Sequence, residues 1–189
     1  MRISNLINED DISQVISKDT IEAMDTFVQA SDMGVLNSAA VVVAKEFGDS
    51  GLFQELIQKD SSAKDEKETK FLSSFHKNLN LLVQKTWIEK ADETLKEQAV
   101  VRIDNFCDVF AQKKYNNCYS DFLSLLYDVV YLMFGIQTKK DGFLEYAMRI
   151  DPEFGIFWWY ICSLPADAPD NEEKTRLFLI LGMTFLANY

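Results

Sequence analysis

The spacing of the apolar residues most constrains the fold, because these residues recur at every third or fourth position along almost the whole chain. One clear run comprises Phe71, Leu72, Phe75, Leu79, Leu82 and Val83, and the next comprises Ile88, Ala91, Leu95, Ala99, Ile103, Phe106 and Phe110. Such spacing places side chains on one face of an α-helix, whereas a strand would need strict alternation. We therefore expect two long helices, one opened by Ser62 and one over residues 88–113, that pack as an antiparallel hairpin.

The same spacing predicts helices in most of the remaining chain. Asp19 and Glu22 have the form of a capping box. Main helices are expected over residues 20–31, 35–47, 120–134, 153–164 and 171–187, with shorter ones at 51–59 and 140–150. We predict an all-α fold in which residues 1–189 form a single domain of about seven to eight helices, arranged as antiparallel helical hairpins in a bundle or short solenoid.

Composition excludes several classes of partner. The chain has 189 residues, of which 48% are hydrophobic, enough to bury one core. Its 30 acidic and 19 basic residues give a net charge of −11, and since nucleic-acid affinity comes mainly from Lys and Arg, we expect no nucleic-acid partner. The longest nearly uncharged runs, at residues 122–136, 154–164 and 177–189, fall short of the roughly 18 residues that span a bilayer. We expect core helices there and no membrane partner.

The cysteines indicate the compartment. Cys107, Cys118 and Cys162 are odd in number and widely spaced, with no CxxC pair and no histidine nearby to complete a zinc site. We interpret them as buried thiols in a reducing environment. The first residues also lack the apolar stretch of a signal peptide. A cytoplasmic location is therefore expected.

Part of the chain, residues 120–164, resembles one degenerate tetratricopeptide unit, a helical hairpin of about 34 residues that stacks into solenoids. The family places a small packing residue where this chain has Ala147 and a proline where it has the Asp151-Pro152 pair. In the next hairpin it places an aromatic and an aliphatic residue at the positions of Trp158 and Ile161. Leu144 and Tyr131 also suit their positions. The chain departs from the family pattern at Asp128, Lys140, Cys162 and Pro165. The resemblance implies a scaffold that holds a partner segment in a helical groove, with no chemistry of its own.

Aromatic residues concentrate at Phe154, Phe157, Trp158, Trp159 and Tyr160. On a helix these side chains point in nearly all directions, so the segment is apolar almost all round. Such a helix either lies in the centre of the core or is partly exposed as a recognition surface, because Trp and Tyr are enriched among the residues that dominate binding interfaces. Both interpretations stay open at this stage.

Few residues suggest catalysis. The only histidine is His76, near the edge of an apolar stripe, and no nucleophile signature or glycine-rich phosphate loop is present. Asp104 and Asp108 are four residues apart and so share one helix face, an arrangement that helical metal sites use. No facing acidic motif accompanies them. We expect no cofactor, and the Asp104 and Asp108 pair is the metal site only of an alternative hypothesis.

The favoured function is therefore binding of another protein, as an adaptor, a scaffold or an antagonist of a basic partner, without catalysis. Two groups of acidic residues could form a negative surface that attracts this partner: Glu9, Asp10 and Asp11 near the start, and Asp170, Glu172 and Glu173 before the final helix. For the second group the alternative is that the acids complement the dipole at the start of the final helix. The alternatives are a helical metal-dependent hydrolase that uses the paired carboxylates, and a helical pocket for an apolar small molecule lined by the aromatic segment.

Overall fold

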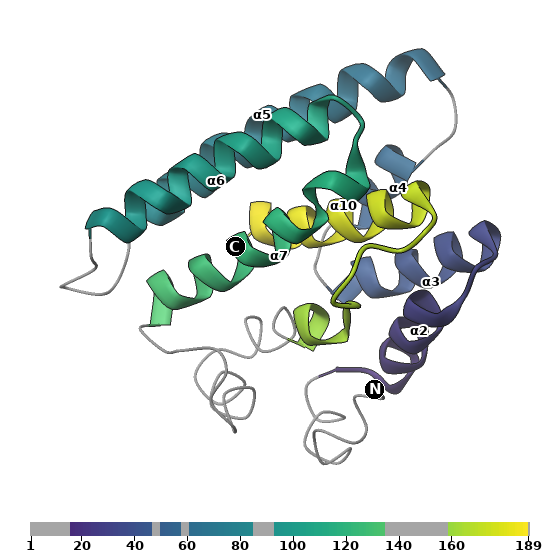
Figure 1. The fold of residues 1–189 in the computed structure, drawn as a ribbon. Helices are drawn as coiled ribbons and strands as arrows, with labels where there is room; N and C mark the ends of the chain where they lie inside the picture. The colour runs from purple at the N-terminus through teal and green to yellow at the C-terminus, as the bar shows by residue number, and fades with distance from the viewer. Residues whose placement is uncertain (1–15, 47–49, 58–60, 85–92, 135–158, 189) are drawn as a thin grey trace.

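The described part of the chain is all helical. A computed structural model describes residues 16–46, 50–57, 61–84, 93–134 and 159–188 (Figure 1), and no strand occurs in these ranges. Residues 159–163 are helical, and the other helices are α2 (Lys18–Gln29), α3 (Met33–Glu46), α4 (Ser50–Ile57), α5 (Ser61–Gln84), α6 (Glu93–Ala111), α7 (Tyr115–Phe134) and α10 (Glu172–Asn188). The all-α prediction is confirmed. The buried apolar residues of these helices form one hydrophobic cluster.

The long helices α5 and α6 form the predicted antiparallel hairpin along one side of the molecule (Figure 1). Two ion pairs show that α5 and α6 run in opposite directions. Asp65 near the start of α5 binds Lys113 just beyond the end of α6, and His76 further along α5 binds Asp104 earlier on α6. Phe75 and Phe106 pack edge to face between the helices, with ring centroids 5.9 Å apart. The apolar stripes identified in the sequence therefore meet each other.

Helix α10 lies at the centre and contacts α3, α4, α5 and α7. Every residue from Thr175 to Leu186 is buried, as expected for a helix that is apolar nearly all round. Gly182 permits the close approach of its neighbours, because a Cβ atom there would lie 2.8 Å from the ring of Phe122 and 3.1 Å from that of Tyr160. The final helix is thus the element around which the others assemble.

The helix boundaries differ from prediction mainly at their starts. The capping box at Asp19 and Glu22 is wrong, because α2 begins at Lys18 and its cap is Ser17, whose side chain accepts a hydrogen bond from the Thr20 amide. Helix α5 begins at Ser61, so Ser62 lies in its first turn. Helix α7 begins at Tyr115, five residues before the expected start, because the chain turns through Lys113 with φ of 60°. The predicted helix at 140–150 and the start of the one at 153–164 lie outside the described residues.

None of the described helices is long and apolar enough to cross a membrane. The tetratricopeptide resemblance stays a prediction, since Leu144, Ala147, Asp151, Pro152 and Trp158 lie outside the described ranges. Of the described residues that it involves, Asp128 forms an ion pair with Arg102 of α6 at 2.5 Å. That pair gives this departure from the family pattern a structural role between α6 and α7.

Candidate functional site

The aromatic segment divides at the boundary of the described residues. Phe154, Phe157 and Trp158 lie outside them, whereas Trp159 and Tyr160 are buried, with at most 1% of either residue exposed. The Tyr160 hydroxyl donates a hydrogen bond to the carbonyl oxygen of Phe178 in α10. Of the two interpretations left open for this segment, burial in the core therefore holds for Trp159 and Tyr160, and neither side chain is exposed as a binding surface.

Asp104 and Asp108 are exposed on α6, and Asp104 interacts with His76 instead of with a second carboxylate. The His76 Nε2 atom lies 2.6 Å from Asp104 Oδ1, and the side chain of Asn80 lies 3.4 Å from the same ring nitrogen. In the part of the chain that the structure describes, no three His, Cys, Asp or Glu side chains lie close enough to hold a metal ion. The metal hypothesis therefore gains no additional ligand from these residues.

The three thiols do not share one environment. Cys107 and Cys118 are buried as predicted, and burial raises the pKa of each to about 12. For Cys107, the nearby Asp104 and Asp108 carboxylates raise the pKa further. Cys162 is exposed, so the prediction that it is buried is wrong. Its place next to the start of the connection to α10 explains the exposure.

A charged cluster lies inside the core, where α10 meets α4, α5 and α7. The Arg176 guanidinium donates to Glu68 Oε2 through Nη2 at 2.7 Å and Nε at 3.2 Å, and to the carbonyl oxygen of Leu56 at 2.8 Å. Tyr115 donates its hydroxyl to the other Glu68 oxygen, and Glu173 accepts from Nη1. Desolvation by burial lowers the pKa of the Arg176 guanidinium, but Glu68, Glu173 and Tyr115 together outweigh it, so that the pKa is raised. All five groups are occupied with one another, which fits a structural role.

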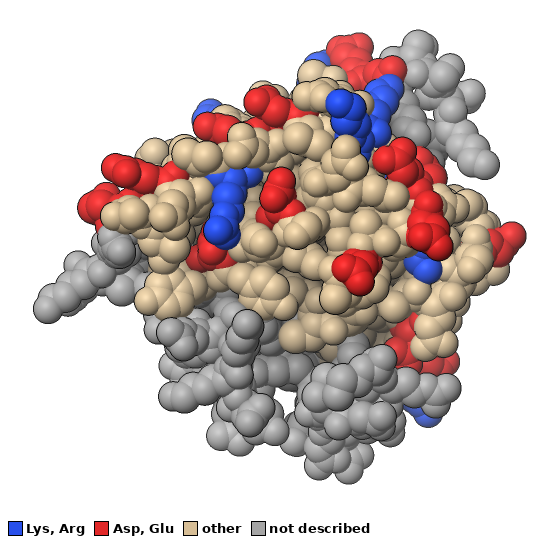
Figure 2. Space-filling model, viewed as in Figure 1, with Lys and Arg blue, Asp and Glu red and all other residues tan. Residues whose placement is uncertain are grey.

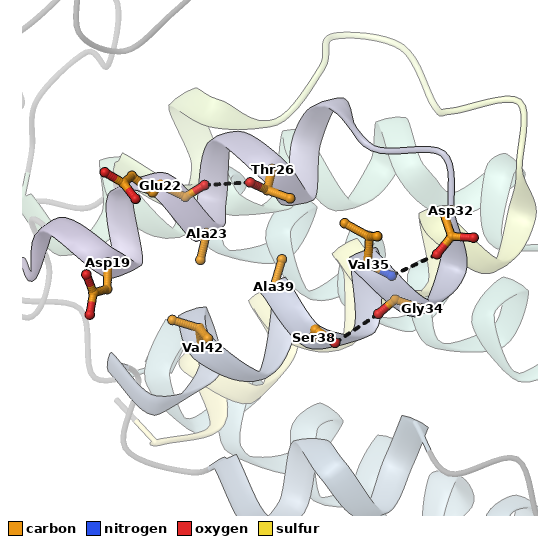
Figure 3. A pocket seen from close by; sticks show the side chains of 10 residues that line it. All are labelled: Asp19, Glu22, Ala23, Thr26, Asp32, Gly34, Val35, Ser38, Ala39 and Val42. Atoms are coloured by element: carbon orange, nitrogen blue, oxygen red, sulfur yellow. Dashed lines mark hydrogen bonds between the residues drawn. The ribbon is translucent and has the colours of Figure 1, made fainter.

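An open groove between α2 and α3 is the best candidate for a binding site (Figure 3). Its volume is about 620 Å³. Each helix contributes one stripe at spacings of three and four: Asp19, Glu22, Ala23 and Thr26 from α2, and Val35, Ser38, Ala39 and Val42 from α3, with Asp32 and Gly34 at one end. The middle of the groove borders the core, since Ala39 belongs to the hydrophobic cluster and Ala23 packs against it, whereas the flanking Asp19, Glu22, Thr26, Val35 and Ser38 are exposed. Met24, Phe27, Leu36 and Val43 are buried in the core itself.

Contacts at both ends hold the two helices of the groove in place. At one end Glu46 of α3 accepts hydrogen bonds from the Thr20 hydroxyl at 2.8 Å and from the Ser17 amide at 3.4 Å. At the other end Lys174 of α10 donates to the carbonyl oxygens of Val28 and Ala30 at 2.8 Å each, which satisfies the end of α2. Burial lowers the pKa of Lys174. Contacts within the chain itself therefore hold α2 and α3 in the arrangement that forms the groove.

The floor of the groove is apolar and its rim is acidic. Ala23 and Ala39 point toward one another across it (Figure 3), and Val35 is 45% exposed. The hydroxyl hydrogens do not face a ligand, since Thr26 donates to the Glu22 carbonyl oxygen and Ser38 to that of Gly34. A ligand consequently meets methyl groups in the middle and carboxylate oxygens at the edges.

The rim of the groove is negatively charged. Asp19, Glu22 and Asp32 are exposed, and no Lys or Arg of the described residues lines the groove. None of the ion pairs formed among the described residues includes these three acids. Asp32 also accepts a hydrogen bond from the Val35 amide at 3.0 Å and so caps the start of α3. The side chains of Asp19 and Glu22 cap no helix among the described residues, since the cap of α2 is Ser17. The geometry suits a ligand that donates hydrogen bonds and carries positive charge.

The acidic residues near α10 serve the helix itself. Asn171 accepts the amides of Glu173 and Lys174, so Asn171 is the cap of α10. Glu172 and Glu173 lie in its first turn, where the helix dipole favours negative charge. Of the two interpretations given above for Asp170, Glu172 and Glu173, the structural one is supported for the last two. Glu9, Asp10 and Asp11 lie outside the described residues.

The sequence did not single out the groove. Asp19 and Glu22 have the local form of a helix cap, and nothing in the sequence of either helix alone indicates how α2 and α3 pair. No protein-family model matches the chain, and no curated protein or solved structure matches it. The function is therefore inferred from the geometry of the chain itself.

Proposed function

We propose that this protein acts without catalysis by binding a basic segment of another protein, as an adaptor, a scaffold or an antagonist, and that the α2–α3 groove is the binding site. The observation that carries the proposal is the acidic rim of the groove, at which Asp19, Glu22 and Asp32 meet no cation of the described chain. Positive side chains of a partner would supply the missing charge.

The overall charge supports the same choice of partner. The net charge of −11 produces a negative field, and Figure 2 shows acidic side chains spread over several helices on the face it presents. Such a field accelerates the encounter with a basic protein and repels polyanions. The acidic rim of the groove then determines the position at which the partner binds.

The expected affinity is divided between the rim and the floor. An exposed ion pair contributes about 0.2 to 1 kcal/mol, so two pairs at Asp19 and Glu22 change the dissociation constant by about two- to thirtyfold. The apolar floor, in which Val35 is 45% exposed, supplies the burial that such pairs cannot. Neutralising the rim should therefore weaken binding strongly without abolishing it.

The compartment belongs to the same proposal. We place the protein in the cytoplasm, because all three of its cysteines are free, which suits a reducing environment. The buried thiols of Cys107 and Cys118 lie on neighbouring helices and need no oxidation to hold the fold. A cytoplasmic partner is expected accordingly.

Quantitative affinity purification tests the proposal. The full chain, the groove variant Asp19→Asn/Glu22→Gln and the control variant Glu97→Gln/Asp121→Asn are each used to capture proteins from the native cell extract. The control removes the same charge from exposed positions of α6 and α7. We expect at least one basic protein to be recovered by the full chain and the control, and about tenfold less of it by the groove variant. Equal recovery by all three proteins would refute the proposal.

A further inference from the structure

The groove is built from two parallel stripes of helical positions, and this geometry indicates what kind of segment fits between them. Residues at i, i+3, i+4 and i+7 on α2 face the same set of positions on α3. Each stripe therefore extends over about two helical turns, or roughly 10 Å. Surfaces of this kind accept a third helix, which lies along the groove and inserts its own i, i+3, i+4 and i+7 side chains.

The middle of the groove is lined by small residues. Ala23 and Ala39 face each other there (Figure 3), and Ser38 lies beside Ala39. Small side chains let helix backbones approach closely, because interaxial distance depends on the residues at the contact. A partner helix with small or short aliphatic residues at its own contact positions would fill this space, whereas a large aromatic residue would hold the backbones apart.

Negative charge stands at both ends of the groove. Asp19 and Glu22 lie at one end, and Asp32 lies at the other, where α2 connects to α3. Glu22 lies seven residues before the end of α2 at Gln29, a rise of roughly 10 Å, and Asp32 follows that end in the connection to α3. Two side chains about seven residues apart on a helix placed along the groove therefore reach Glu22 and Asp32. Lys or Arg at those two positions would pair with the acids, and the flexible stems of such side chains cover additional apolar surface.

We propose that the α2–α3 groove binds an α-helix of another protein that carries Lys or Arg at positions i and i+7 and small or short aliphatic residues at i+3 and i+4. This inference rests on the proposed function, because it names the partner of the same site. It adds the secondary structure of the bound segment and the spacing of its charges. The helix completes a layer of three with α2 and α3.

Two other occupants fit the groove less well. Residues 1–15 contain one basic residue, Arg2, against Glu9, Asp10 and Asp11, so they lack the second cation. The exposed stripe of α5 formed by Lys70, Ser73, Ser74 and Lys77 has the required spacing, which makes a second copy of the chain a rival. However, Lys70 already binds Glu66 at 2.6 Å, and two copies with a net charge of −11 repel each other.

Site-specific photocrosslinking tests the inference in the full chain. A benzophenone amino acid replaces Val35, which is 45% exposed in the groove, and, in a control, Val101, which is 56% exposed on α6 outside it. Both proteins are irradiated in the native cell extract, and the crosslinked peptides are sequenced by mass spectrometry. We expect a peptide of another protein, captured at position 35 and not at 101, with two Lys or Arg residues seven apart.

A synthetic copy of the captured peptide then tests its conformation. Proline at its central position should weaken binding to the full chain by on the order of 100-fold, because proline breaks a helix interior, whereas alanine there should change binding less than threefold. Equal binding of the proline peptide would overturn the helix inference and leave the proposed function intact. Capture of residues 1–15 or of α5 would overturn the choice of occupant. If position 35 captures nothing beyond what position 101 captures, both proposals fail.

Discussion

The buried cluster around Arg176 gives the sharpest prediction about stability. The Arg176 side chain is 1% exposed and that of Glu68 is 10% exposed, so neither charge is solvated by water. Replacement of Glu68 by glutamine keeps the shape but removes the charge that lies 2.7 Å from Arg176 Nη2. Loss of one partner of a buried ion pair costs about 3 to 5 kcal/mol, because the other charge remains buried.

The structure places this substitution at the lower end of that range. Arg176 keeps its hydrogen bonds to the Leu56 carbonyl oxygen and to Glu173, and Glu173 is 45% exposed, which weakens its attraction. We therefore expect Glu68→Gln to lower the free energy of unfolding by about 3 kcal/mol. For a chain of this length that corresponds to a fall in Tm of about 6 to 12 °C.

A double-mutant cycle measured by urea unfolding and far-UV circular dichroism checks the reasoning. Arg176→Met should also destabilise, but the double variant should cost about 2 to 3 kcal/mol less than the sum of the single ones, because it removes the unpaired charge. Glu66→Gln, which breaks the exposed Lys70 pair, should leave the Tm unchanged. If Glu68→Gln behaves like Glu66→Gln, or if the two sites prove additive, the cluster does not stabilise the core as described.

Three further predictions follow from the packing and the titrating groups. Gly182→Ala should lower the free energy of unfolding by about 1 to 2 kcal/mol, because the new methyl group would lie 2.8 Å from the Phe122 ring. Gly34→Ala should be tolerated, because its methyl group would lie 3.2 Å from the carboxylate of Asp32, which is exposed and can move. Equal melting temperatures for the two variants would contradict this packing. A thiol reagent at pH 8 should label Cys162 before Cys107 and Cys118. Desolvation raises the pKa of Cys162 to about 11, but Cys162 is exposed, whereas the other two thiols are buried and have pKa values of about 12. Mass spectrometry of partly labelled protein would show the order. The free energy of unfolding should fall as pH rises above about 9, because the unfolded chain releases the protons of Cys107 and Cys118 at their ordinary pKa of 9.0, whereas burial raises the pKa of each in the folded chain to about 12. Each thiol then lowers the free energy of unfolding by up to about 1.4 kcal/mol per pH unit. Urea midpoints that stay constant from pH 9 to 11 would argue against this.

Periodic spacing was sufficient to predict the helices, because their apolar stripes are local features of the sequence. The hairpin of α5 and α6 followed from two such stripes next to each other in the chain. The start of α2 could not be predicted in this way. Asp19 and Glu22 resemble a capping box, but Ser17 takes the cap and Thr20 bonds to Glu46, 26 residues away, and no local pattern reveals that contact.

The candidate site was harder to predict for the same reason. Asp19 and Ala39 line one groove only when α2 and α3 pair, and the side of each helix that stays uncovered depends on the packing of the rest of the chain. The buried pair of Arg176 and Glu68 also joins residues 108 positions apart. Its only local signal is an arginine directly before the apolar run that begins at Leu177, which indicates that the charge has a partner but does not identify it.

The central claim is that the acids of the α2–α3 groove bind cations of a partner helix, and a charge exchange tests it most directly. The dissociation constant of the captured peptide is measured by calorimetry against the full chain, against Asp19→Lys/Glu22→Lys and against the control Glu97→Lys/Asp121→Lys. We expect the groove reversal to weaken binding on the order of 100-fold, the control to change it less than threefold, and a peptide with its own Lys or Arg replaced by Glu to recover binding to the reversed groove. Equal dissociation constants for the two reversed proteins, or no recovery with the exchanged peptide, would contradict the claim.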